Sequence, residues 1–294
     1  MRKNNFLILC LTIVIIIGCD NVSYTYETNV DYEAPNWTSD GKVVFIKDSN
    51  YVKIAHGAMG SEQWNVEGSK EVLTLCEINS DGTGFTEKGV MLRSEDYAYA
   101  LEVTGLSSAG DWVAFGIEGL HIYVANRNAT NIEEVEEGTY PDFSPDAAKI
   151  VYEKPDNGIW IMDRDGGNDH PIWQDSLNKV PSWSSDGDRI AFVRYEGWQD
   201  EDLWVMDVGG GNREKILDGT RAHQSDWAPV DSNAIVCSVS GRTRVIYLDT
   251  ISMRELEGAY TLKWSPDGAC FTGTDENGIF VMEVDSSNKI LIQP

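Results

Sequence analysis

Residues 183–192 read Trp183-Ser-Ser-Asp-Gly187-Asp-Arg-Ile-Ala-Phe192, and residues 203–207 read Leu203-Trp-Val-Met-Asp207. The first segment has an aromatic residue, a polar turn that ends in Asp-Gly, and then an apolar run. Asp-Gly favours a tight turn because glycine adopts positive φ at little cost. Large apolar residues that alternate with small ones suit a pleated sheet buried between neighbours. The two segments therefore predict consecutive β-strands.

The same pattern recurs along the chain. Copies of the first segment begin at Trp37, Leu106, Phe143, Trp183, Trp227 and Trp264, and copies of the second begin at Leu75, Ile122, Ile159, Leu203, Ile246 and Ile279. Successive first anchors are 69, 37, 40, 44 and 37 residues apart. A period near 40 residues with four short strands is typical of a propeller blade. Because one blade cannot bury both of its faces, the sequence predicts an all-β, six-bladed β-propeller with four-stranded blades.

Within each repeat we expect the first strand to end at the aromatic anchor. The second and third strands follow at Ile-Ala-Phe and Ile-Trp-Val-Met-Asp, and an outer fourth strand lies at positions such as Glu214–Leu217 and Lys289–Ile292. The tryptophans that share repeat positions are predicted to be core residues and not a carbohydrate-binding stripe. They are Trp37, Trp183, Trp227 and Trp264, with Trp160 and Trp204 in the third strands.

Together, Trp-Ser-Pro-Asp-Gly-x-x-Ile-Ala-Phe and Ile-Trp-Val-Met-Asp resemble the repeat of the TolB-like propeller family. The resemblance extends over about residues 33–294 and implies a six-bladed propeller. The family's namesake, a periplasmic protein, has an α/β domain before its propeller, which we expect this chain to lack. A shared fold does not specify a shared function, so the ligand has to be argued from the residues.

The N-terminal segment predicts export and lipidation. Arg2 and Lys3 precede an apolar run from Phe6 to Ile17, which is too short for a transmembrane helix and typical of a signal peptide. The run ends in Gly18-Cys19, which resembles the lipobox of bacterial lipoproteins, although an ordinary signal peptide with a chance cysteine is the alternative.

We therefore expect a lipoprotein signal peptide over residues 1–19, a lipid on Cys19, a tether over residues 20–32 and the propeller over residues 33–294. The alternating segment Val22–Glu27 is an alternative to part of the tether, since it could pair with the last blade and close the ring. The expected location is the bacterial cell envelope, with the domain facing the periplasm or the exterior.

Charge and cysteine content exclude some classes of partner. The chain has 23 basic and 48 acidic residues and a net charge of −25. Removal of residues 1–19 takes away two basic residues and no acidic one, so the mature chain would carry −27. Such a surface repels nucleic acid and favours basic partners or divalent cations. Cys76, Cys237 and Cys270 lie in apolar runs, where no disulfide framework is expected.

Irregular length is concentrated in the loops of one predicted propeller face. The insertion at about Lys47–Lys70 and the link at about Arg93–Tyr99 combine aromatic and charged residues, a composition typical of recognition surfaces, although such loops can also simply tolerate insertion. The predicted ligand-binding residues are Tyr51, His56, Trp64, Tyr97, Tyr195, Trp198, Arg221 and His223. The expected partner is an envelope protein or a glycan, and we expect a monomer.

The sequence assigns no catalytic residue, no metal site and no cofactor. The four histidines lack metal-ligand spacing, and no Gly-x-Ser-x-Gly motif is present. The Asp163–Asp169 segment resembles a calcium loop but lacks the glutamate at its twelfth position. The preferred function is a binding module. The alternative is a propeller-based lyase or hydrolase acting on a polysaccharide, which could use His56, Arg221 and His223.

Overall fold

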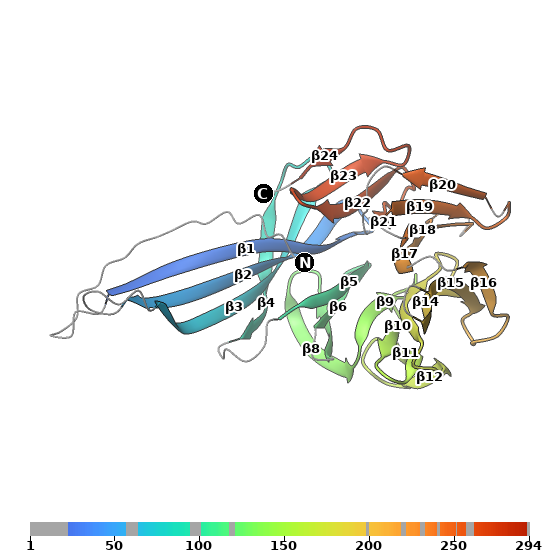
Figure 1. Ribbon diagram of the computed structural model, residues 1–294, viewed down its shortest axis with the longest axis horizontal. Coiled ribbons are helices and arrows are strands. Elements are labelled where there is room, and N and C mark those ends of the chain that lie inside the picture. The colour runs from blue at the N-terminus through green and yellow to red at the C-terminus, as the bar shows by residue number, and fades with distance from the viewer. Residues whose placement is uncertain are drawn as a thin grey trace.

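The computed structural model describes residues 23–56, 64–94, 101–117, 121–197, 200–218, 222–229, 233–239, 242–250, 252–256 and 262–292. These residues form six four-stranded antiparallel sheets arranged in a ring, as Figure 1 shows. In every sheet the strands lie side by side in chain order, so each sheet is one blade built from consecutive strands. The predicted all-β, six-bladed propeller is confirmed.

The strands follow the predicted repeat. Blade 1 contains β1 (Ser23–Trp37), β2 (Lys42–His56), β3 (Trp64–Asn79) and β4 (Thr86–Ser94). Blade 2 contains β5 (Val103–Ala109), β6 (Trp112–Ile117), β7 (His121–Asn126) and β8 (Thr130–Glu137). Blade 3 contains β9 (Thr139–Phe143), β10 (Lys149–Lys154), β11 (Gly158–Asp163) and β12 (His170–Trp173).

The remaining three blades follow the same order of strands. Blade 4 contains β13 (Asn178–Trp183), β14 (Arg189–Gly197), β15 (Asp200–Asp207) and β16 (Glu214–Leu217). Blade 5 contains β17 (Ala222–Trp227), β18 (Ala234–Val239), β19 (Arg242–Tyr247) and β20 (Ser252–Leu256). Blade 6 contains β21 (Leu262–Trp264), β22 (Cys270–Asp275), β23 (Gly278–Glu283) and β24 (Ile290–Leu291).

The repeated turn has a local chemical cause. In blade 4 the Ser184 hydroxyl donates to Asp186 at 2.6 Å and accepts the Arg189 amide at 2.9 Å, which fixes the turn between the first two strands. Gly187 has a φ of +83°, a conformation that costs glycine little. The equivalent hydroxyl–carboxylate pairs in other blades are Thr38–Asp40, Ser144–Asp146 and Ser265–Asp267. The Ser-x-Asp-Gly motif is therefore a self-contained turn.

Hydrophobic residues fill the spaces between blades. Each of the six core clusters in the described residues joins two neighbouring blades, and the anchors Trp37, Trp183 and Trp227 are buried in them. The tryptophans expected in the core at positions 160, 204 and 264 are partly buried and pack against three of these clusters. The repeat tryptophans therefore serve packing, as predicted.

In the part of the chain that the structure describes, blades 6 and 1 close the ring by packing and share no strand. Phe45 and Ile78 of blade 1 share a cluster with Val281 of blade 6. The Trp37 indole N–H of blade 1 donates to the Lys263 carbonyl of blade 6 at 3.1 Å. The first and the last blade are thus held together by side chains.

Blade 1 differs from the other blades because its first three strands are much longer. The outer part of its sheet, residues 23–32, 47–56 and 64–74, extends away from the ring, and we call it the arm (Figure 1). Ser23 pairs with His56, and His56 pairs with Trp64, so these residues lie at the far end of the arm.

Two expectations from the sequence are corrected here. From Ser23 onward, the segment expected to be a tether is the outer half of β1, and it pairs with β2 and not with the last blade. The insertion expected as a loop over Lys47–Lys70 is mostly strand. Tyr24 and Tyr26 alternate with polar residues, a pattern typical of a strand. The segment with which these two residues pair lies more than 20 residues later in the chain. In the described residues, no helix is long and apolar enough to cross a membrane.

Candidate ligand-binding site

A hollow of about 330 Å³ lies on one face of blade 1, at the base of the arm. Its size is at the lower end of the range for small-ligand sites. The lining residues come from three neighbouring strands: Lys47, Ser49 and Tyr51 of β2, Lys70, Val72 and Thr74 of β3, and Glu87, Val90 and Arg93 of β4. We call it the basic hollow.

Strand register creates the hollow. Alternate residues of a strand share one face, so positions 47, 49 and 51 point the same way, as do positions 70, 72 and 74. Ser49 lies directly opposite Val72, and Val72 lies directly opposite Arg93. Small buried side chains at the centre form the floor, and the longer side chains of Tyr51 and Lys70, which face each other, form part of the rim.

The hollow is positively charged in a strongly acidic protein. Its lining has three cations and one carboxylate, whereas the whole chain carries −25. Lys47 binds Glu87 at 2.6 Å. Burial by itself lowers the pKa of Lys47. The hydrogen bond and the charge of the Glu87 carboxylate together outweigh burial and raise this pKa, so the lysine stays protonated. Arg93 is exposed at the rim, where it can reach an anionic group.

The Tyr51 side chain adds an aromatic surface to this charge. Tyr51 is 45% exposed, the highest value among the large aromatic side chains that the described residues expose. A tyrosine ring offers a large apolar area and a hydroxyl at low entropic cost, which is why interfaces favour it. The hollow therefore combines cations, an aromatic ring and the hydroxyls of Ser49 and Thr74.

The opposite face of the same sheet is acidic. Asp48, between Lys47 and Ser49, points to this other face together with Glu71. Burial, together with the neighbouring Glu71 and Glu33 carboxylates, raises the pKa of Asp48 to about 8. Glu71 also accepts the Leu101 amide at the entry to blade 2. This face is used for packing towards blade 2 and leaves the basic face as the one open to a ligand.

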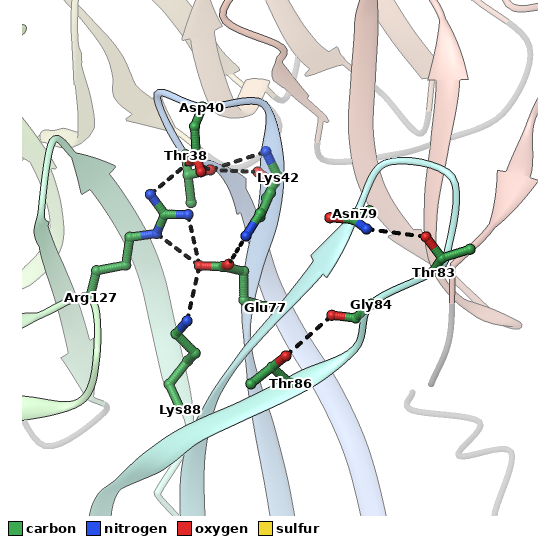
Figure 2. A network of polar contacts seen from close by, with 10 residues as sticks. All are labelled: Thr38, Asp40, Lys42, Glu77, Asn79, Thr83, Gly84, Thr86, Lys88 and Arg127. Atoms are coloured by element: carbon green, nitrogen blue, oxygen red, sulfur yellow. Dashed lines mark hydrogen bonds and ion pairs between the residues drawn. The ribbon is translucent and has the colours of Figure 1, made fainter.

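A second charged cluster joins blades 1 and 2 on the face of the ring that carries the turns between the first and second strands (Figure 2). The Glu77 side chain is only 4% exposed and binds Lys42 and Arg127, each at 2.8 Å, with Lys88 at 3.7 Å. Arg127, from the turn after β7, also binds Asp40 at 2.7 Å. Burial opposes ionisation of Glu77, but hydrogen bonds from Lys42 and Arg127 outweigh it and lower its pKa.

These cations are already bound to carboxylates, so the cluster serves as a clamp between blades. Arg127 holds Asp40 strongly enough to lower the pKa of that carboxyl to about 2. The clamp borders a hollow of about 470 Å³.

Two other spaces are poorer sites. Where the first strands of the blades meet at the centre of the ring, the space beside Asp142 and Lys263 is about 10 Å³, roughly the room for one water. The surrounding polar groups bind one another: Asp142 accepts the Trp183 amide at 2.7 Å, and Lys263 binds Asp226 at 3.0 Å. A further hollow of about 330 Å³ lies between blades 4 and 5, where Arg189 and Lys215 are outnumbered by acidic residues.

The structure places the predicted binding residues in different parts of the molecule. Tyr51 lines the basic hollow. Tyr195 lies in blade 4, on the far side of the ring, where burial and the charge of Glu201 together raise its pKa to about 12. His56 and Trp64 face each other at the end of the arm, and His223 lies in β17, but their side chains are outside the description. Cys19, Tyr97, Trp198 and Arg221 lie outside the described residues, so their roles stay predictions.

Sequence reasoning did not assign Lys47, Lys70 and Arg93 to the site. The signal was present, since Lys47-x-Ser-x-Tyr51 and Lys70-x-Val-x-Thr74 both have strand periodicity with a small residue at or near the centre. It was missed because this region was interpreted as a loop, in which alternate positions share no face.

Comparison with known proteins supports the fold. No family model matches the chain. An uncharacterized protein of Agrobacterium fabrum is 28% identical over 256 residues, which cover 58% of this chain and 87% of that protein. The crystal structure of TolB from Acinetobacter baumannii has a TM-score of 0.60 at 13% identity and covers 90% of this chain and 78% of its own.

Oligogalacturonate lyase from Vibrio parahaemolyticus is also similar in structure. It has a TM-score of 0.51 at 12% identity, covering 96% of this chain and 99% of its own. The chain therefore has a TolB-like β-propeller fold, and that fold is shared with an enzyme. At these identities the likeness concerns architecture alone.

Proposed function

We propose that this protein is a lipid-anchored binding module of the bacterial cell envelope whose ligand is an acidic glycan bound in the basic hollow. The proposal rests on one observation, the convergence of Lys47, Lys70 and Arg93 beside the exposed Tyr51 in a protein of net charge −25. The TolB-like fold and the signal-like sequence before Cys19 support an extracytoplasmic location.

The chemistry of the hollow fits a sugar that carries a carboxylate. Arg93 can bind a carboxylate through two parallel hydrogen bonds, and Lys70 supplies a second positive charge across the floor. The Tyr51 ring offers an apolar face to the ring of a sugar, and Ser49 and Thr74 offer hydroxyls. Only a short segment of the acidic glycan enters the hollow. Such a segment avoids the repulsion that the surrounding acidic surface would impose on a longer polyanion.

The test is a binding titration with short hexuronate-containing oligosaccharides and with neutral oligosaccharides of equal length. Wild-type protein should prefer the acidic series. Arg93→Gln and Tyr51→Ala should each weaken binding by about tenfold or more, as expected for interface hot spots. Lys149→Gln, which removes the same charge from an exposed lysine of blade 3, is the matched control and should leave binding unchanged. Equal binding of both series, or equal loss in the control, would reject the basic hollow as the site.

The shared fold with a lyase makes an enzyme the alternative outcome of the same experiment. The oligosaccharides are recovered after incubation and analysed for chain cleavage. Intact recovery supports a binding module. Cleavage that is lost on His223→Ala would replace the proposal with a polysaccharide-degrading activity.

A further inference from the structure

The chain enters the folded domain at the far end of the arm and not at the ring. β1 begins at Ser23, which pairs with His56 at the arm's end, and it reaches the ring only ten residues later at Glu33, the partner of Ile46 (Figure 1). A short tether that led directly to the ring would have left the ring free to turn in any direction. A strand paired with β2 without interruption from Ser23 to Glu33 fixes the direction of entry.

The sequence separation between Cys19 and Ser23 limits how far the proposed lipid anchor can lie from the arm. Cys19 precedes Ser23 by four residues, and an extended chain of that length spans at most about 14 Å. The arm itself, from Ser23 to Tyr32, is about 30 Å long at the usual rise of a strand. The ring is therefore farther from Ser23 than a four-residue connection can span.

We propose that the arm is a rigid spacer that stands on the membrane at its Ser23 end and holds the ring away from the lipid surface. This inference rests on the lipid anchor of the proposed function, but not on binding in the basic hollow. The partner surface is a bilayer with anionic headgroups.

Electrostatics explains the use of a spacer. The mature chain would carry −27, so its ring is repelled by an anionic leaflet. Screening reduces this repulsion over a Debye length of about 8 Å at physiological salt, and the arm is several such lengths long. A ring held one arm's length from the bilayer can stay anchored, because repulsion from the anionic leaflet is largely screened at that distance.

The spacer also sets the height of the basic hollow. Tyr51 pairs with Thr28, five residues from Ser23, and Lys47 pairs with Tyr32, nine residues from Ser23. These positions place the hollow between about 17 and 30 Å from the end of the arm. The site would therefore face the layer next to the membrane, below the ring.

The experiment measures distance from the bilayer at defined sites. Acylated full-length protein is inserted into vesicles that contain headgroup-labelled quencher lipids. Cys270→Ser removes the partly exposed thiol, since Cys76 and Cys237 are buried. A fluorophore is then attached through Tyr51→Cys on the arm or Glu214→Cys on blade 4, opposite the arm in the ring.

Quenching should be several-fold stronger at position 51 than at position 214. Insertion of a Gly-Ser linker of about 20 residues before Val22 should abolish this difference, because a flexible linker of that length lets the domain tumble. Vesicle flotation with Cys19→Ala as the negative control reports on the anchor separately.

The outcomes separate the two proposals. Flotation that persists in Cys19→Ala overturns the lipid anchor. Flotation that depends on Cys19, together with equal quenching at both positions, overturns the spacer and leaves the anchor standing.

Discussion

The clamp around Glu77 should make a large contribution to the stability of the junction between blades 1 and 2. In Glu77→Gln the side chain keeps its shape but loses the charge that faces Lys42 and Arg127, each at 2.8 Å. Removal of one partner from a buried ion pair costs about 3–5 kcal/mol. Lys42 is 40% exposed and can regain water, and glutamine still accepts one hydrogen bond, so we expect a loss of about 2–3 kcal/mol.

The loss should depend on pH in a defined direction. The folded-state pKa of Glu77 is lowered, so its contribution to stability is present above the ordinary pKa of glutamate and disappears as the pH falls through the folded-state value. The difference between wild type and Glu77→Gln should therefore be full at neutral pH and shrink on acidification. High salt should change it little, because the carboxylate is buried.

Urea unfolding followed by tryptophan fluorescence, at neutral and at successively lower pH, measures this difference. Asp163→Asn is the matched control, because it makes the same chemical change in the Lys149–Asp163 pair, which is much more exposed than Glu77, and should have a much smaller effect. The explanation fails if Glu77→Gln destabilises no more than the control, or if its effect is independent of pH.

Two further predictions concern the arm and the core. Wild-type stability should fall as the pH rises from about 4 towards 8, because Asp48 has a pKa of about 8 in the fold and an ordinary one when unfolded. Asp48→Asn should remove this part of the dependence in urea titrations, and parallel profiles would contradict it. Trp183→Ala should lower stability by about 3–5 kcal/mol. Tyr51→Ala should have almost the same melting temperature as wild type. Equal melting temperatures for Trp183→Ala and Tyr51→Ala would contradict the burial of Trp183 and the exposure of Tyr51.

The repeat could be predicted from the sequence because its chemistry is local. The contact between Ser184 and Asp186 spans two residues, and Gly187 supplies the positive φ in the same turn. An aromatic anchor and an alternating apolar run complete each blade within about 40 residues. The turn occurs in four of the blades, and the aromatic or apolar anchor with its apolar run recurs six times, so the repeat specifies the number of blades and leaves only their closure to be found.

The structure, in contrast, decided the arm and the site. The strand Ser23–Tyr32 is recognisable by its alternation, but its partner lies at Lys47–His56, and pairing between distant segments depends on register and not on local preference. A shift of one residue would have turned Lys47 and Tyr51 to the acidic face.

Arg93 joins these residues only because β4 pairs with β3 opposite Val72. The sequence by itself determined that this protein is a ring of six blades, since each repeat encodes its own turns and the apolar residues that pack against the next blade. The tertiary structure decided that one blade is extended into an arm and that three cations from three strands share one hollow. Both features depend on which strand residues face each other, which no single segment of the chain specifies.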